Sequence, residues 1–266
     1  LSAVASLASR GLDVYVADFG APEDAEGGLS RTIDQHVLAV DRAIDFIHAK
    51  TGRAVHLAGY SQGGMFAYLA AAYRRSAGIG SVIAFGAPVD MRRNLPVKLH
   101  EDAAARVLDL AHAGLSGVLS RIEALPADFT SIGFKLISPK QELKHFFQTV
   151  GLLHDRDELL RSLPKRQFLG GEGFVAWPGP ALRAFVDELI VQNRMMAGGI
   201  VVDGRTLTLA DIASPVLVVI GLRDEIALPA AVRGISRAAP HAEVFEIGVE
   251  AGHFGIVVGS RALRET

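Results

Sequence analysis

The feature that most constrains this chain is a serine at the junction between a strand pattern and a helix pattern. Residues 55–58 form a short, mostly apolar run that is typical of a strand. Beyond Ser61, apolar residues recur at helical spacing: Met65, Tyr68, Leu69 and Ala72. Gly59 and Gly63 lie two positions to either side, where we expect a side chain to collide with the neighbouring strand and helix. The stretch predicts a strand, a sharp turn at Ser61 and a helix.

The pattern Gly-x-Ser-x-Gly matches the nucleophile elbow of the α/β-hydrolase fold. Such a turn raises the serine Oγ above the sheet and leaves the backbone N–H of Gln62 at a helix N-terminus. That N–H is our candidate donor to the oxyanion that develops in acyl transfer. The alternative is a glycine-rich turn with a surface serine. An acid and a histidine placed after later strands would decide between the two interpretations.

A candidate acid follows an apolar run at 215–221 that is typical of a buried strand. Asp224 and Glu225 are adjacent, and neighbouring side chains point to different sides of an extended backbone. The spacing Gly-x-x-Asp favours Asp224 as the acid.

The histidine candidate follows the next predicted strand, at 242–248. Of the nine histidines, eight lie in helical patterns, in the elbow strand or at a turn, where a solvated or structural role is the default. Only His253 follows the last strand, between Gly252 and Gly255. The chain order Ser61, Asp224, His253 is the order expected of a catalytic triad in this fold.

Strand and helix patterns alternate over the first ninety residues. The predicted helices lie at 2–10, 30–50 and 62–75. The predicted strands lie at 13–19, 55–58 and 81–85. This order predicts an α/β protein whose mostly parallel sheet carries helices on both faces.

The alternation stops between residues 91 and 212. Helices are predicted at 101–112, 138–150, 155–163 and 180–196, and a hairpin at 200–207 around Asp203-Gly204. We interpret 91–212 as a helical cap inserted between two parts of the hydrolase core, 1–90 and 213–266.

Composition excludes several other function classes. The net charge of -2 and the scattered basic residues argue against a nucleic-acid partner. There is no cysteine, which excludes disulfides, thiolate catalysis and cysteine-based metal sites. We expect no cofactor and no metal. No run of eighteen apolar residues exists, so we expect no transmembrane segment, and we predict a cytoplasmic protein.

Six motifs stand in order along the chain: residues 11–22, Gly59-Tyr60-Ser61-Gln62-Gly63-Gly64, Pro88-Val89-Asp90, Gln192-Asn193-Arg194, Gly221-x-x-Asp224-x-Ile226 and Gly252-His253-Phe254-Gly255. Together they resemble the polyhydroxyalkanoate synthases, α/β-hydrolase-fold acyltransferases that polymerise hydroxyacyl-CoA. The resemblance covers nearly the whole chain and implies a triad of Ser61, Asp224 and His253. It also implies a small acyl substrate and a homodimer formed through the cap. Because the sequence stops within a predicted helix at 261–265, we expect a longer parent chain, with fusion to another domain as a possibility.

One departure from that family is chemical. Its nucleophile is cysteine, whereas this chain has Ser61. A thiol exchanges readily with thioesters, while a serine needs full general-base help and forms an oxygen ester. We therefore expect hydrolysis or single acyl transfer. The alternatives are a polyester synthase that uses serine and a catalytically silent acyl-binding domain.

A second departure concerns the N-terminal strands of the fold. The resemblance places one more strand before Leu1, between the strand at 13–19 and the elbow strand. The loop after that strand would donate the second oxyanion N–H. We expect the 266 residues on their own to be impaired in activity without it.

Overall fold

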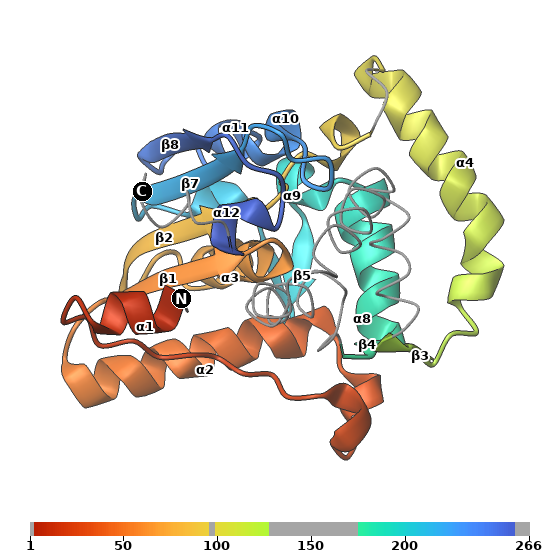
Figure 1. Ribbon diagram of the computed structural model, residues 1–266. Coiled ribbons are helices and arrows are strands. Elements are labelled where there is room, and N and C mark those ends of the chain that lie inside the picture. Colours follow the sequence, from red (N-terminus) through yellow and green to blue (C-terminus); the bar gives the residue numbers. More distant parts are fainter. Residues whose placement is uncertain (1–2, 96–98, 128–174, 259–266) are drawn as a thin grey trace, which may run out of the picture.

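A four-stranded parallel sheet forms the centre of the computed structural model, which describes residues 3–95, 99–127 and 175–258 (Figure 1). The strands are β1 (Val55–Tyr60), β2 (Ile79–Phe85), β7 (Val216–Gly221) and β8 (Val244–Val249), in the order β1-β2-β7-β8. All three pairings are parallel, with Gly59 opposite Ala84 and Phe85 opposite Val219. The predicted α/β class is confirmed.

Helices flank this sheet, as Figure 1 shows. The longest in the first part are α2 (Ile33–Thr51) and α3 (Gln62–Tyr73). Every residue of α3 from Gly64 to Ala72 is buried, because the helix packs against β1 and β2 on one side and α2 on another. The short helices are α1 (Ala3–Ala8), α10 (Pro229–Val232), α11 (Ile235–Ala238) and α12 (Gly255–Val258), with 3-10 turns at Pro22–Asp24, Gly28–Ser30, Met91–Arg93 and Leu209–Asp211.

The strand predicted at 13–19 is wrong. These residues belong to no helix or strand, and among the described residues nothing pairs with the outer edge of β1. A segment rich in β-branched and aromatic residues forms a strand only where an adjacent strand completes its hydrogen-bond ladder. Phe19 instead packs its ring against His36 of α2 and Phe66 of α3.

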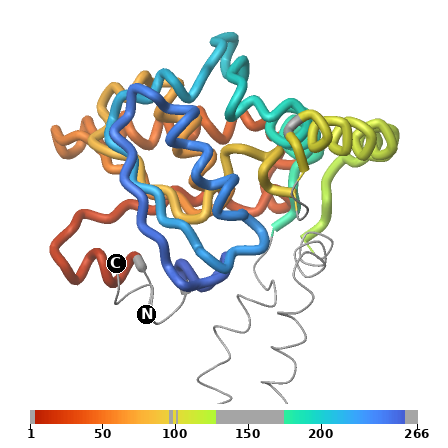
Figure 2. Tube along the Cα trace, turned by 90° about the horizontal axis from the view of Figure 1, so that it is seen from above, coloured from red at the N-terminus to blue at the C-terminus, as the bar shows by residue number. Residues whose placement is uncertain are grey.

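The segment predicted as a cap contains α4 (Glu101–Leu119), which runs beyond the predicted end at 112. Figure 2 shows α4 standing at the side of the molecule, away from the sheet. A two-residue ladder joins β3 (Ala124–Leu125) to β4 (Trp177–Pro178). The helices predicted at 138–150 and 155–163 lie outside the described residues. The cap boundaries therefore stay a prediction.

The single helix predicted at 180–196 is wrong. The structure has α8 (Gly179–Ala184), a π-helical stretch η4 (Phe185–Val191) and then a separate α9 (Arg194–Ala197). The break falls at Asn193, whose φ of 51° is left-handed. Its side-chain amide accepts from the backbone N–H of Met91 at 2.8 Å and donates to Asp90 at 3.1 Å. These bonds to another segment hold the chain out of helical geometry.

The predicted hairpin is confirmed as β5 (Ile200–Val202) and β6 (Arg205–Leu207). Asp203 and Gly204 both have positive φ, as a type I′ turn requires. In the described part of the chain, no helix combines the length and the apolar character needed to cross a membrane.

His36 gives a pH-dependent test of the packing around α2. Its ring stacks on Phe66 at 5.3 Å, with Phe19 at 5.1 Å, and its Nδ1–H donates to the carbonyl of Thr32 at 2.7 Å. Burial lowers the pKa of His36 below its ordinary 6.5. The unfolded chain therefore binds the proton more readily, and protonation opposes folding.

We predict that His36 makes the free energy of unfolding rise with pH from its lowered pKa up to about 6.5, and no further. In His36→Gln this increment disappears, as measured by urea unfolding across that range. His100→Gln, at an exposed histidine, is the matched control and should keep the increment. An identical pH slope in His36→Gln and the unchanged protein would contradict the packing described.

Candidate active site

Ser61 occupies the strand-to-helix turn that the sequence predicts. Its φ of 52° and ψ of -120° are a strained conformation for a residue with a side chain. The turn is held from both sides: the N–H of Ser61 donates to the carbonyl of Phe85 at 2.8 Å, and its own carbonyl accepts from Gly64 at 3.0 Å and Met65 at 3.2 Å. The serine is thus fixed between the end of β2 and the first turn of α3.

Two glycines allow this turn, and only one of them is among those predicted. A Cβ on Gly59 would lie 2.4 Å from the backbone oxygen of Gly63. A Cβ on Gly63 would meet no atom of the described part of the chain within 4 Å, so the predicted collision there is wrong. The second crowded position is Gly64, where a Cβ would lie 2.6 Å from that of Ala87. The helix turns Gly63 outward and Gly64 into the sheet.

The structure brings Ser61, His253 and Asp224 into one hydrogen-bonded row. His253 Nε2 lies 2.9 Å from Ser61 Oγ, and His253 Nδ1 lies 2.7 Å from Asp224 Oδ2. A carboxylate can only accept, so Nδ1 carries the proton and Nε2 is left to accept from the serine hydroxyl. Asp224 and His253 are both 3% exposed, which shields the row from water.

Asp224 is held by its own loop as well as by the histidine. Its Oδ1 accepts from the N–H of Ile226 at 2.9 Å and of Ala227 at 2.8 Å, which leaves Oδ2 for His253. The neighbouring Glu225 is exposed. The alternation argument for Asp224 over Glu225 agrees with this geometry.

Gly86, directly after β2, is a part of the site that the sequence analysis missed. Its φ is +54°, and a Cβ there would lie 3.4 Å from both Asp224 Oδ2 and His253 Nδ1. A side chain at this position would crowd the bond between the acid and the imidazole. A glycine closing the strand at 81–85 was the available signal.

Tyr60 was also missed. Its ring centroid lies 4.9 Å from that of His253, and Phe254 contacts the same imidazole edge-on at 5.7 Å. The Tyr60 hydroxyl is buried and has no hydrogen-bond partner among the residues that the structure describes. Burial, reinforced by the charge of Asp224, raises the pKa of Tyr60, so the phenol stays neutral. Tyr60 therefore covers the imidazole as an uncharged aromatic wall.

Gln62 supplies the first backbone N–H of α3. Among the described residues, no backbone carbonyl accepts from this N–H, as expected at the start of a helix. It is free to donate to an anionic oxygen beside Ser61. In the part of the chain that the structure describes, no three acidic or histidine side chains gather as metal ligands would.

Comparisons with known proteins give relatives along almost the whole chain. The poly(3-hydroxyalkanoate) polymerase subunit PhaC of Allochromatium vinosum is 28% identical over 268 residues, covering 99% of this chain and 72% of the relative. The subunit of the same name from Haloferax mediterranei is 23% identical over 98% of this chain, which spans about half (51%) of that relative.

Among solved structures, the monoacylglycerol lipase of Paleococcus ferrophilus is 20% identical, with a TM-score of 0.47 over 86% of this chain and 72% of the lipase. No protein-family profile matches.

The elbow gives a test with a built-in control. We predict that Gly59→Ala lowers the free energy of unfolding by about 1–3 kcal/mol, because its Cβ overlaps backbone atoms that cannot move without opening the turn. Gly63→Ala should leave stability unchanged or raise it slightly, since its Cβ enters open space in a helix. Urea unfolding of both variants measures the difference. Equal losses would mean that the turn is not built as described.

Proposed function

We propose that this chain, which is similar to PhaC polymerase subunits and has a parallel α/β sheet, is a serine-dependent acyl hydrolase or acyltransferase. Its substrates would be acyl esters or acyl-CoA thioesters, and the reaction would pass through an acyl-serine. The observation that supports this most strongly is the continuous row from Ser61 Oγ through His253 to Asp224, at 2.9 and 2.7 Å.

In the acylation step, Ser61 Oγ attacks the carbonyl carbon of the substrate while its proton passes to His253 Nε2. The carbonyl oxygen becomes an oxyanion, and the N–H of Gln62 donates to it. The tetrahedral intermediate collapses as His253 returns the proton to the leaving thiol or alcohol. The products of this half-reaction are the free leaving group and an oxygen ester on Ser61.

In the deacylation step, His253 takes a proton from water or from an acceptor hydroxyl, which then attacks the ester. Collapse returns the proton to Ser61 Oγ and releases the acid or the new ester. Asp224 stays ionised throughout and stabilises the imidazolium that forms twice per cycle. Its bonds from Ile226 and Ala227 keep the carboxylate in place for this role.

Serine as the nucleophile favours hydrolysis or a single acyl transfer over polymerisation. A thiol of pKa about 8.5 is partly ionised at neutral pH, whereas a serine hydroxyl attacks only with its base in position. Repeated exchange with CoA thioesters is correspondingly less favourable on serine. Polymerisation through Ser61 is the second candidate, supported by the relatives' name, and a silent acyl-binding domain is the third.

We also propose a cytoplasmic location and a small-molecule acyl substrate. A homodimer formed through residues 91–212 and fusion to a further domain are additional proposals.

The test of this function uses 3-hydroxybutyryl-CoA and the full-length natural chain. We predict release of CoA together with free 3-hydroxybutyrate or a single transferred acyl group. Thiol titration measures the released CoA, and chromatography identifies the acyl product. Ser61→Ala should lower kcat by about 10⁴-fold or more, because the nucleophile is gone. Asp224→Asn should lower it by about 10⁴-fold, because an amide favours the wrong imidazole tautomer.

Glu225→Gln is the matched control, since Glu225 is the adjacent acid outside the row, and it should keep the full rate. Insoluble polyester as the product would favour the second candidate over the first. Turnover that survives Ser61→Ala would contradict both.

A further inference from the structure

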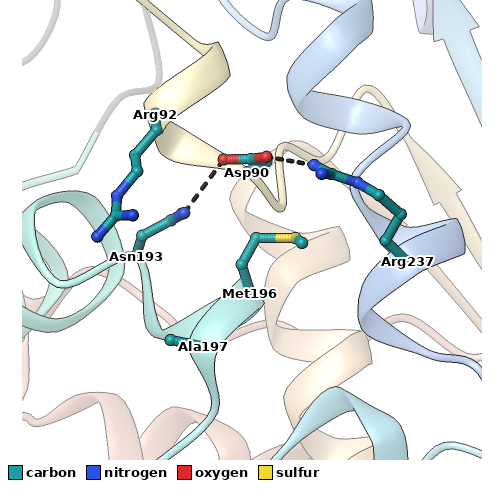
Figure 3. Close-up of a pocket in the computed structure, with 6 residues that line it drawn as sticks. All are labelled: Asp90, Arg92, Asn193, Met196, Ala197 and Arg237. Carbon is teal, nitrogen blue, oxygen red and sulfur yellow. Dashed lines mark hydrogen bonds and ion pairs between the residues drawn. The ribbon is translucent and has the colours of Figure 1, made fainter. Parts of the chain in front are cut away.

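A cavity of about 190 Å³ opens at the carboxyl end of β2, outside the row of Ser61, His253 and Asp224 (Figure 3). Three elements form it: the turn η3 (Met91–Arg93), α9 and α11. Its lining combines one acid, two arginines, an amide and two apolar side chains: Asp90, Arg92, Arg237, Asn193, Met196 and Ala197.

The acid in this cavity already has its full complement of partners. Asp90 is 4% exposed, and its Oδ1 accepts from Asn193 Nδ2 at 3.1 Å. Its Oδ2 accepts a hydrogen bond from Arg237 and forms an ion pair with Arg93, whose Nε lies 3.2 Å away. Figure 3 shows Asn193 and Arg237 reaching Asp90 from opposite sides. Since two guanidinium groups face this one carboxylate, the cavity has no negative charge left for a cationic ligand.

Arg92, unlike Asp90, has a buried polar atom without a partner among the described residues. Its Nε is buried and has no hydrogen-bond partner, and no carboxylate among the described residues pairs with its guanidinium. A buried donor without an acceptor is rare, because it has lost its water and gained nothing in return. The Arg92 side chain also lines the cavity, so a ligand there can bring an acceptor to its guanidinium group.

The lining therefore carries a net positive charge, with Arg92 and Arg237 against Asp90 alone. A guanidinium presents a planar fork of N–H donors that matches the two oxygens of a carboxylate or phosphate. Met196 and Ala197 form an apolar side, which lowers the local dielectric and strengthens such a pair. We propose that this cavity is a binding site for a small oxyanion, a phosphate or a carboxylate, held by Arg92.

Ser61, His253 and Asp224 do not line this cavity, although Asn94 joins its turn to the loop of Asp224. Asn94, two residues after Arg92, donates to the carbonyl of Ile226 at 2.9 Å and accepts from the N–H of Leu228 at 2.8 Å. These residues belong to the loop that holds Asp224. The proposal concerns binding alone, so Ser61→Ala should bind the oxyanion as the unchanged protein does.

Isothermal titration of the full chain with inorganic phosphate and, separately, with acetate tests the proposal. We predict saturable binding of at least one of them, and the tighter one identifies the ligand class. Arg92→Met, which keeps the stem and removes the donors, should weaken that binding by about tenfold or more. Arg75→Met is the control at an arginine whose side chain is 83% exposed, and it should change nothing. Absence of binding, or equal binding by Arg92→Met, would overturn the proposal.

A second measurement needs no variant and so does not depend on how Arg92→Met folds. Phenylglyoxal modifies accessible arginines, and peptide mass spectrometry reports each site. Added phosphate or acetate should protect Arg92 and leave the modification of Arg75 unchanged. If Arg92 is modified at the same rate with and without the anion, the cavity is not an oxyanion site.

Discussion

The strained backbone at Ser61 is the constraint on which the rest of the site depends. A residue with a side chain at φ 52° costs about 1–3 kcal/mol, and it persists only where its surroundings impose it. Here the close approach of Gly59 to the Gly63 backbone and the bond from Ser61 to Phe85 impose it. The same conformation carries Oγ to 2.9 Å from His253. The same turn thus sets both the strained backbone of Ser61 and the position of its hydroxyl group.

The parallel sheet explains why residues almost two hundred positions apart meet there. Successive parallel strands end at the same edge, so the loops after β1, β2, β7 and β8 lie together. They contribute Ser61, Gly86, Asp224 and His253 respectively. β7, the strand between β2 and β8, is buried along almost its whole length, and the loop that carries Asp224 follows its end. Asn193 bonds to Asp90 and to the N–H of Met91, and Asn193 and Asp90 line the cavity beside Arg92.

Local patterns predicted the elements whose partners lie close in sequence. Motifs and the order of the strands singled out Ser61, Asp224 and His253, whose side chains the structure brings within hydrogen-bonding distance. The hairpin around Asp203-Gly204 follows from turn chemistry. The patterns failed where residues far away in the sequence determine the local structure. Residues 13–19 have strand composition but no neighbouring strand among the described residues, and Asn193 breaks a helix to reach Asp90 and Met91. Gly64 and Gly86 matter through atoms of other segments, so their spacing alone did not identify them.

The most direct measurement of the central claim is covalent labelling of the full-length natural chain by a fluorophosphonate, which reacts only with an activated serine. Peptide mapping should find the label on Ser61, and labelling should be lost in Ser61→Ala, strongly slowed in a His253→Gln variant and unchanged in Glu225→Gln. Failure of Ser61 to react, or a label rate that does not depend on His253, would contradict the account.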